Sequence, residues 1–370
     1  MMRTILFTFA TLFVTVSLSA QSSSSTIPAT PASEHVVLVI TDGVRWQEIF
    51  RGAERALMGK AGKVRDSTAL HQDFWRETPE ARRAALMPFL WGTIARDGQI
   101  LGDSAGGSVA RITNRFKFSY PGYSETFTGF FDPRIDSNNF PPNPNVTVFE
   151  WLNRDPAFSG RVEAYATWSA FRRIINAERS GIPVRDGWDR GAPVGPTVEA
   201  EQLRTLYRTT TRMWGDNAVD ALMHESMRLG TRGAMPRVLF IGYGETDEWA
   251  HDGRYDLYLR AAQQVDRFLE SLWTAWQADP KTRGKVTLLV STDHGRGWGR
   301  EWTDHGEDVN GAEYIWSAAL GPDVAPLGVR RDTPTTQAQM AATIAAALGR
   351  QWQRAEPRAA PPLPIFKPSR

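Results

Sequence analysis

Six aspartate and histidine residues follow apolar stretches at several places in this 370-residue chain. They are Asp42, Asp247, His251, Asp293, His294 and His305. Any one of them has an ordinary explanation, because an aspartate after a strand often caps a helix and a single histidine is often structural. The ordered set is harder to explain in that way. Carboxylate oxygens and neutral imidazole nitrogens are ligands for Zn²⁺, and for Mn²⁺ where carboxylates dominate, so the set predicts a metal site.

The elements that would position these residues alternate between strand and helix. Buried strands are predicted at 36–40, 238–241 and 286–290, which are short apolar runs rich in β-branched residues. Helices are predicted at 79–94, 200–229 (more than one helix), 256–276 and 334–348, the last with Thr333 as N-cap and Pro334 in its first position. This alternation indicates an α/β fold with a mainly parallel sheet. In such folds the carboxyl ends of the strands carry the chemistry, and the candidate ligands follow those ends.

The composition is that of a globular protein, with 41% hydrophobic and 23% charged residues. The formal net charge is +2, with 43 Lys and Arg against 41 Asp and Glu spread along the chain, so no nucleic-acid-binding patch is indicated. The absence of cysteine excludes disulfides, thiolate metal sites and a cysteine nucleophile.

The N-terminus has the three-part plan of a secretory signal peptide, predicted to span residues 1–20. A basic start precedes an apolar run of about 15 residues, which is shorter than the roughly 20 that a transmembrane helix needs, and small residues end the segment at Ala20. We therefore expect a periplasmic or secreted protein without a transmembrane anchor after cleavage.

The remainder is predicted to form one domain at 36–350, after a disordered leader at 21–35. Insertions are expected at about 51–118 and 155–236, the first helping to wall the site. A Pro-rich tail at 351–370 is expected to form neither helix nor strand. The sequence does not determine the oligomeric state.

The motifs together resemble the alkaline phosphatase superfamily, and in particular its type I phosphodiesterase/nucleotide pyrophosphatase-like and related metalloenzyme branches. They are Thr-Asp-Gly at 41–43, Asp-x-x-x-His at 247–251, Thr-Asp-His-Gly at 292–295 and His-Gly at 305–306. The resemblance implies a three-layer sandwich around a mainly parallel sheet, and two divalent metal ions, with Zn²⁺ favoured and Mn²⁺ as the alternative. It implies one metal held by Asp247, His251 and His305, and the other by Asp42, Asp293, His294 and the nucleophile oxygen.

The resemblance places a Ser or Thr nucleophile after Asp42 at the start of a helix. Ser124 is the first candidate, because Gly-x-Ser-Glu at 122–125 is similar to the context found in the phosphoglycerate mutase branch. The spacing of the diesterase branch instead points to position 125, which is Glu125, so Thr126 stays open as the second candidate. Either hydroxyl has the alternative role of capping a helix.

Substrate contacts are predicted at Asn138 or Asn139, at the place where the diesterase branch has a phosphate-contacting asparagine, and at Arg296, which could bind a phosphate oxygen. Turn formation by the asparagines and packing by the arginine are the alternatives. Trp298 and Trp302 could line the mouth of the site or pack inside the fold.

The resulting hypothesis is an exported two-metal hydrolase of small-molecule phosphoric esters, acting as phosphatase or phosphodiesterase through a covalent phospho-enzyme. The alternatives are a sulfatase-like or phosphonate-hydrolase-like member of the superfamily, and a metal-binding protein without catalysis. Sulfatases have a modifiable residue followed by Pro and Arg at fixed spacing. Here Ser119 and Pro121 are followed by Tyr123 in place of the Arg, which disfavours that branch.

Overall fold

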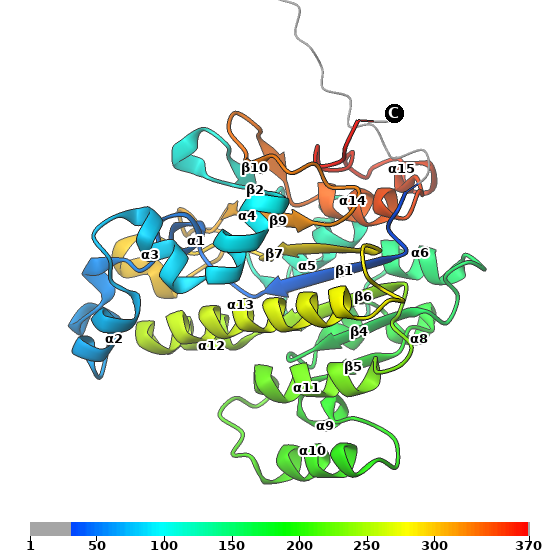
Figure 1. The fold of residues 1–370 in the computed structure, drawn as a ribbon, viewed down its shortest axis with the longest axis horizontal. Coiled ribbons are helices and arrows are strands. Elements are labelled where there is room, and N and C mark those ends of the chain that lie inside the picture. Colours follow the sequence, from blue (N-terminus) through cyan, green and yellow to red (C-terminus); the bar gives the residue numbers. More distant parts are fainter. Residues whose placement is uncertain (1–30, 369–370) are drawn as a thin grey trace, which may run out of the picture.

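The computed structural model describes residues 31–368, so the predicted signal peptide and most of the leader lie outside the described residues. A central sheet of eight strands has the order β10-β2-β9-β7-β1-β6-β4-β5 (Figure 1). Its strands are β1 (His35–Thr41), β2 (Gln99–Leu101), β4 (Val162–Ala166), β5 (Val184–Asp186), β6 (Val238–Tyr243), β7 (Val286–Ser291), β9 (Ser317–Leu320) and β10 (Gly328–Val329). β1 pairs in parallel with both β6 and β7, whereas β9 runs antiparallel to β7. A small second sheet joins β11 (Thr335–Thr336), β3 (Ala110–Arg111) and β8 (Tyr314–Ile315).

Side chains of the central strands alternate between two buried cores, because successive residues of a strand point to opposite faces. Val37 and Val39 of β1 belong to one core, and Leu38 and Ile40 belong to the other. Burial on both faces explains why these strands appear in the sequence as unbroken apolar runs.

Helices cover both faces of the sheet and make a three-layer sandwich (Figure 1). The first core contains residues of α1 (Trp46–Arg51), α2 (Ser67–Phe74), α3 (Pro79–Leu86), α4 (Ala95–Asp97), α11 (Asp220–Gly230), α12 (Glu245–His251) and the long α13 (Tyr255–Ala278). The second contains residues of α5 (Ser119–Thr128), α6 (Val148–Arg154), α7 (Phe171–Ile174), α8 (Ala177–Ser180), α14 (Gln339–Ala347) and α15 (Trp352–Ala355). α9 (Gly187–Gly191) and α10 (Val198–Thr209) pack around a smaller core of their own.

The three predicted strands are confirmed as β1, β6 and β7, and the predicted helix at 256–276 is confirmed as α13. The helix expected at 79–94 is interrupted at Met87, because Pro88 disfavours helical backbone at the residue before it. α3 ends at Leu86, and helical backbone resumes at 88–97 with a π-helical stretch at Leu90–Ile94. The helix expected at 334–348 begins only at Gln339, and the predicted cap at Thr333 is wrong because the next residues pair in β11.

The region expected as a second insertion, 155–236, contributes β4 and β5 to the central sheet and is therefore part of the main fold. The Pro-rich tail was expected to form neither helix nor strand, and the helical turn α15 contradicts that prediction. The tail also buries Leu363 and Ile365 in the second core. Proline removes a hydrogen-bond donor but does not prevent neighbouring apolar residues from being buried. The last residues of the expected leader are fixed as well, since Ser33 donates its hydroxyl to Asp323 at 2.6 Å.

Helices long and apolar enough to cross a membrane are absent from residues 31–368.

Candidate metal centre

Five of the six predicted ligands lie just beyond the carboxyl ends of three adjacent strands. Asp42 follows β1 and the pair Asp293–His294 follows β7, while α12, which carries Asp247 and His251, begins directly after β6. Since β7, β1 and β6 are neighbours in the sheet, the parallel arrangement brings their ends together.

The first group consists of Asp42, Asp293 and His294, and all three residues are buried. The Nε2 atom of His294 lies 3.4 Å from Asp42 Oδ1 and 3.5 Å from Asp293 Oδ2. Among residues 31–368, both of these carboxylate oxygens are buried without a hydrogen-bond partner. Two unpaired buried carboxylate oxygens facing an imidazole nitrogen are costly unless a cation joins them. We call this set the buried group.

Neighbouring atoms hold the buried group in position. Tyr123 donates its hydroxyl to Asp42 Oδ2 at 2.9 Å, and the backbone N–H of Gly43 donates to Asp293 Oδ1 at 3.1 Å. The Nδ1 atom of His294 lies 2.9 Å from the carbonyl oxygen of Gly295. Donation of the Nδ1 proton to that carbonyl leaves Nε2 as a free ligand atom.

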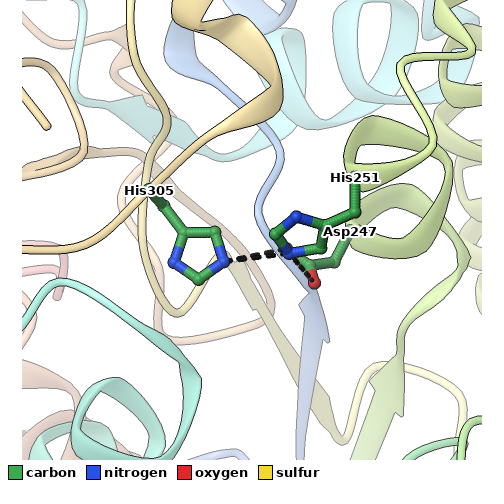
Figure 2. Close-up of side chains that lie close together, drawn as sticks. All are labelled: Asp247, His251 and His305. Carbon is green, nitrogen blue, oxygen red and sulfur yellow. Dashed lines mark hydrogen bonds and ion pairs between the residues drawn. The ribbon is translucent and has the colours of Figure 1, made fainter.

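The second group consists of Asp247, His251 and His305, which we call the outer group (Figure 2). Asp247 and His251 share one face of α12 because they are four residues apart, and His305 reaches them from the loop after β7. His251 Nε2 lies 3.0 Å from His305 Nε2 and 3.1 Å from Asp247 Oδ2. These three atoms converge on one point, as the ligands of a single ion do.

The two groups adjoin one another through Asp247. Its Oδ1 atom lies 3.8 Å from Nε2 of His294 in the buried group and 3.8 Å from Nε2 of His305 in the outer group. Two adjacent sets of three oxygen and nitrogen donors fit a pair of divalent ions, each with room for further ligands.

The histidines differ in their affinity for protons. Burial and the positive charges of neighbouring His294 and Arg296 hold the pKa of His305 well below its usual value, and burial also lowers the pKa of His251. Burial acts in the same direction on His294, but the carboxylates of Asp293 and Asp42 outweigh it and raise its pKa to about 9. Without a cation, the buried group therefore retains a proton at pH 7, whereas the outer imidazoles are neutral.

Arg296 does not occupy the position of a substrate contact. Its side chain is buried, and it donates to the carbonyl oxygens of Gly43 at 3.1 Å and Thr303 at 2.5 Å as well as to the Asp247 carboxylate. With these donors engaged inside the protein, the prediction that it binds phosphate does not fit the structure. Its role is to join the loop after β1 to the loop after β7.

Ser119, the first residue of α5, places a serine hydroxyl beside the buried group. Ser119 Oγ lies 3.4 Å from His294 Nε2, and the residue is almost fully buried. The Ser-x-Pro sequence at 119–121 could have predicted that a helix begins near Ser119, because proline is favoured in the first turn of a helix.

The two predicted nucleophiles lie further along the same helix and are engaged elsewhere. Ser124 Oγ accepts a hydrogen bond from Asn143 Nδ2 at 3.1 Å, and Thr126 donates its hydroxyl to the carbonyl oxygen of Gly122 at 2.9 Å. Both predictions followed local motif spacing, which placed the helix start about one turn too late.

Close contact between α5 and the loop after β7 brings Ser119 to the site. A Cβ atom added at Gly122 would lie 2.4 Å from the carbonyl oxygen of Asp293, so only glycine allows the helix to approach this closely. At the helix start, Asn138 Oδ1 accepts the backbone N–H of Tyr120 at 2.9 Å, which places this asparagine beside Ser119. Asn139 is exposed, and its backbone N–H bonds to Ser137.

A buried network links α5 to the outer group. The Glu125 carboxylate accepts the side-chain N–H of Asn114 at 2.9 Å, and Asn114 Oδ1 accepts the backbone N–H of Lys117 at 2.9 Å. Lys117 has a φ of 53°, and its carbonyl oxygen lies 3.3 Å from His305 Nδ1. Glu125, at the position expected for a nucleophile, thus helps to orient a candidate metal ligand.

The histidines not assigned to metal are paired within the protein. His35 and His71 contact backbone carbonyl oxygens through Nδ1, and His224 Nδ1 lies 2.8 Å from the hydroxyl of Tyr243. Trp302 is buried, whereas Trp298 is 45% exposed.

Solved structures with this architecture include an alkaline phosphatase, PafA, with a TM-score of 0.57 at 10% identity, covering 91% of this chain and 99% of that chain. A phosphonate monoester hydrolase of Agrobacterium radiobacter has a TM-score of 0.52 at 12% identity, covering 85% of this chain and 74% of that chain. A putative sulfatase from Bacteroides thetaiotaomicron has a TM-score of 0.53 at 9% identity, covering 86% and 71%. This chain has the alkaline phosphatase-like fold. No protein-family model and no curated protein sequence matches the chain.

Proposed function

We propose that this protein is an exported two-metal hydrolase of phosphoric esters. The observation that carries the proposal is the convergence of the buried group, the outer group and the Ser119 hydroxyl at one edge of the sheet. The similar structures include a phosphatase, a phosphonate monoester hydrolase and a putative sulfatase, which agrees with ester hydrolysis at this edge.

In this proposal Asp42, Asp293 and His294 hold one ion, and Asp247, His251 and His305 hold the other. When bound, such ions lower the pKa of an attacking hydroxyl and neutralise charge on the phosphoryl and leaving oxygens. The unpaired oxygens Asp42 Oδ1 and Asp293 Oδ2 are the feature of this structure that best fits such ions.

Ser119 is the nucleophile in this proposal, in place of Ser124 and Thr126. Its Oγ forms a bond to phosphorus as the bond to the ester oxygen breaks, and water later releases phosphate and restores the serine. The N-terminus of the ten-residue helix α5 favours the negative charge of the phosphoryl group. Asn138 lies beside Ser119 through its bond to Tyr120 N, and we assign it the contact with a phosphoryl oxygen.

The test of the reaction class is turnover with the metal content measured in the same preparation. The mature protein is loaded with Zn²⁺ or Mn²⁺ and assayed on p-nitrophenyl phosphate, bis-p-nitrophenyl phosphate, p-nitrophenyl phenylphosphonate and p-nitrophenyl sulfate. About two ions per chain and preference for a phosphate ester support the proposal. Preference for the sulfate or phosphonate would move the protein to those substrate classes, and two ions without turnover would support the binding role.

The assignment of the nucleophile is tested by Ser119→Ala with Ser124→Ala as the matched control on the same helix. We expect Ser119→Ala to lower kcat by about 10³-fold or more with metal content retained, because the attacking atom is removed. Ser124→Ala is expected to keep kcat within about threefold, with a loss of roughly 1 kcal/mol of stability from the lost bond to Asn143. Equal losses of kcat in the two variants would contradict the assignment.

A further inference from the structure

A separate cavity of about 400 Å³ lies beside the candidate metal centre. It is formed by α1 with the residues on either side of it, by Trp75 between α2 and α3, by Arg82 of α3, and by the loop after β7. Its wall includes three tryptophans, Trp46, Trp75 and Trp298, and the arginines Arg51, Arg55 and Arg82. None of these residues belongs to the two ligand groups.

The cavity shares its supporting loops with the metal centre. Arg45 lines the cavity three residues after Asp42, and its Nη1 donates to the carbonyl oxygen of Gly297 at 3.3 Å. Gly297 follows Arg296, which bonds to Asp247. A ligand in the cavity would therefore lie against the backbone that positions both ligand groups.

The aromatic rings of the wall are paired with cations. The Arg82 and Arg55 guanidinium carbons lie 4.5 Å and 5.2 Å from the ring centre of Trp75. Arg51 lies 5.5 Å from the ring of Trp46, which in turn packs edge-on against Trp298 at 6.1 Å. Flat rings alternating with guanidinium planes suit a planar ligand, because both kinds of surface stack.

Three of the four arginines that line the cavity carry uncompensated positive charge. Within residues 31–368, Arg51, Arg55 and Arg82 make no ion pair with a carboxylate. The carboxylate of the wall, Glu54, pairs with the buried Arg45 at 2.9 Å. In addition, the indole N–H of Trp46 is buried without a hydrogen-bond partner in the described structure. An anion with a hydrogen-bond acceptor would complement this wall in charge and in donors.

We propose that this cavity binds a planar aromatic anion, with its ring against Trp46 and Trp75 and its negative group between Arg51 and Arg55. The site is distinct from the phosphoryl site at the two ligand groups. Its ligand is either a free molecule or the remote part of an ester that reaches the metal centre.

The direct test titrates 2-naphthalenesulfonate into the mature protein, with inorganic phosphate present to saturate the metal centre. Tryptophan fluorescence and calorimetry report binding. We expect saturable quenching at one site per chain, with weaker binding of the neutral 2-naphthol and of methanesulfonate, which lacks the ring.

Two variants locate the site. The double variant Arg51→Gln/Arg55→Gln should weaken sulfonate binding by roughly tenfold or more, because two charge-assisted contacts are lost. The matched control Arg204→Gln/Arg208→Gln, on α10, which contributes no residue to the cavity, should leave binding unchanged. Trp75→Leu keeps the charge and should reduce both affinity and quenching. Absence of saturable binding, displacement by phosphate, or equal binding by the Arg51/Arg55 variant would overturn the proposal.

A second experiment distinguishes a free ligand from the remote part of an ester substrate. This experiment, unlike the titration, rests on the proposed function. It compares KM for 2-naphthyl phosphate and for 6-sulfonato-2-naphthyl phosphate. A lower KM for the sulfonated ester, lost in Arg51→Gln/Arg55→Gln, assigns the cavity to the substrate. Equal KM values with sulfonate binding retained assign it to a free ligand. If neither ester is hydrolysed, the proposed function fails while the titration still decides the site.

Discussion

The buried group and the outer group contain the same residue types but are constructed differently. Asp293 and His294 have fully buried side chains and follow a central strand, whereas the side chain of His251 is 45% exposed on a seven-residue helix. Backbone N–H and tyrosine hydroxyl donors hold the buried carboxylates. His305 of the outer group instead depends on the conformation of a long loop.

The difference predicts different properties for the ions that the two groups would bind. The buried group is preorganised by the sheet and contains two carboxylate oxygens without a hydrogen-bond partner among residues 31–368, so we expect its ion to contribute to stability. The outer group is accessible to solvent and has neutral imidazoles, so we expect its ion to exchange readily with its surroundings.

The largest effect is expected from Asp293→Asn, which keeps the shape of the side chain but removes a negative ligand from the buried group. Metal content should fall from about two to about one per chain, and kcat/KM should fall by about 10³-fold, equivalent to several kcal/mol of transition-state stabilisation. Metal analysis and steady-state kinetics measure this. Full metal content in the variant would contradict the role of Asp293 as a ligand of the buried group.

Gly122→Ala should have the next largest effect, because the new Cβ atom would lie 2.4 Å from the Asp293 carbonyl oxygen and push α5 away from the buried group. We expect kcat to fall about 100-fold from misplacement of Ser119, and stability to fall by about 1–3 kcal/mol. Gly92→Ala, where an added Cβ meets nothing within 4 Å, is the control and should keep activity. Equal activity of the two variants would contradict the role of close approach.

Asn114→Ala should affect the outer group selectively. It removes the acceptor that holds Lys117 N–H and so loosens the carbonyl that orients His305. We expect a 10- to 100-fold weaker affinity for the outer ion, as for other residues that orient metal ligands. Competition with a chelator should give two affinities, of which only the weaker changes. A parallel loss at both sites would indicate general unfolding instead.

The smallest effect is expected from a change of one pH unit. Because the pKa of His294 is about 9 without an ion, metal uptake by the buried group must displace a proton throughout the neutral range. Its affinity should therefore rise about tenfold for each unit of pH up to about 9. His251 and His305 have lowered pKa values and are already deprotonated at pH 7, so the outer affinity should change little above that pH. Proton release during metal titration measures the difference, and identical pH profiles at the two sites would contradict it.

The sequence predicted much of this site because its ligands follow recognisable elements. The strand before Asp42 is an unbroken apolar run, and Asp247 and His251 have helical spacing, so both local structure and direction of the side chains could be anticipated. The predicted α/β architecture is confirmed for the same reason, since strands buried on both faces have a distinct pattern.

The failures have a common physical cause, which is that contacts distant in sequence override local patterns. Ser124 has a suitable neighbour in Glu125, but the close approach of α5 to Asp293 in the loop after β7 brings Ser119 to the site instead. Arg296 has the chemistry to bind phosphate, yet the loops fold around it and bury it. The Pro-rich tail was expected to form neither helix nor strand, yet Trp352–Ala355 form a helical turn and Leu363 and Ile365 are buried in the second core.

The sequence by itself determined the residue types, the order of the strands along the chain and the polar residues that end them. Those features depend on backbone propensity and on hydrophobic period, which act over a few residues. The tertiary structure alone decided which hydroxyl reaches the candidate ligands, which group is buried, and that arginines and tryptophans from three segments form one cavity. These outcomes depend on parallel pairing and helix packing between residues hundreds of positions apart, which no local pattern encodes.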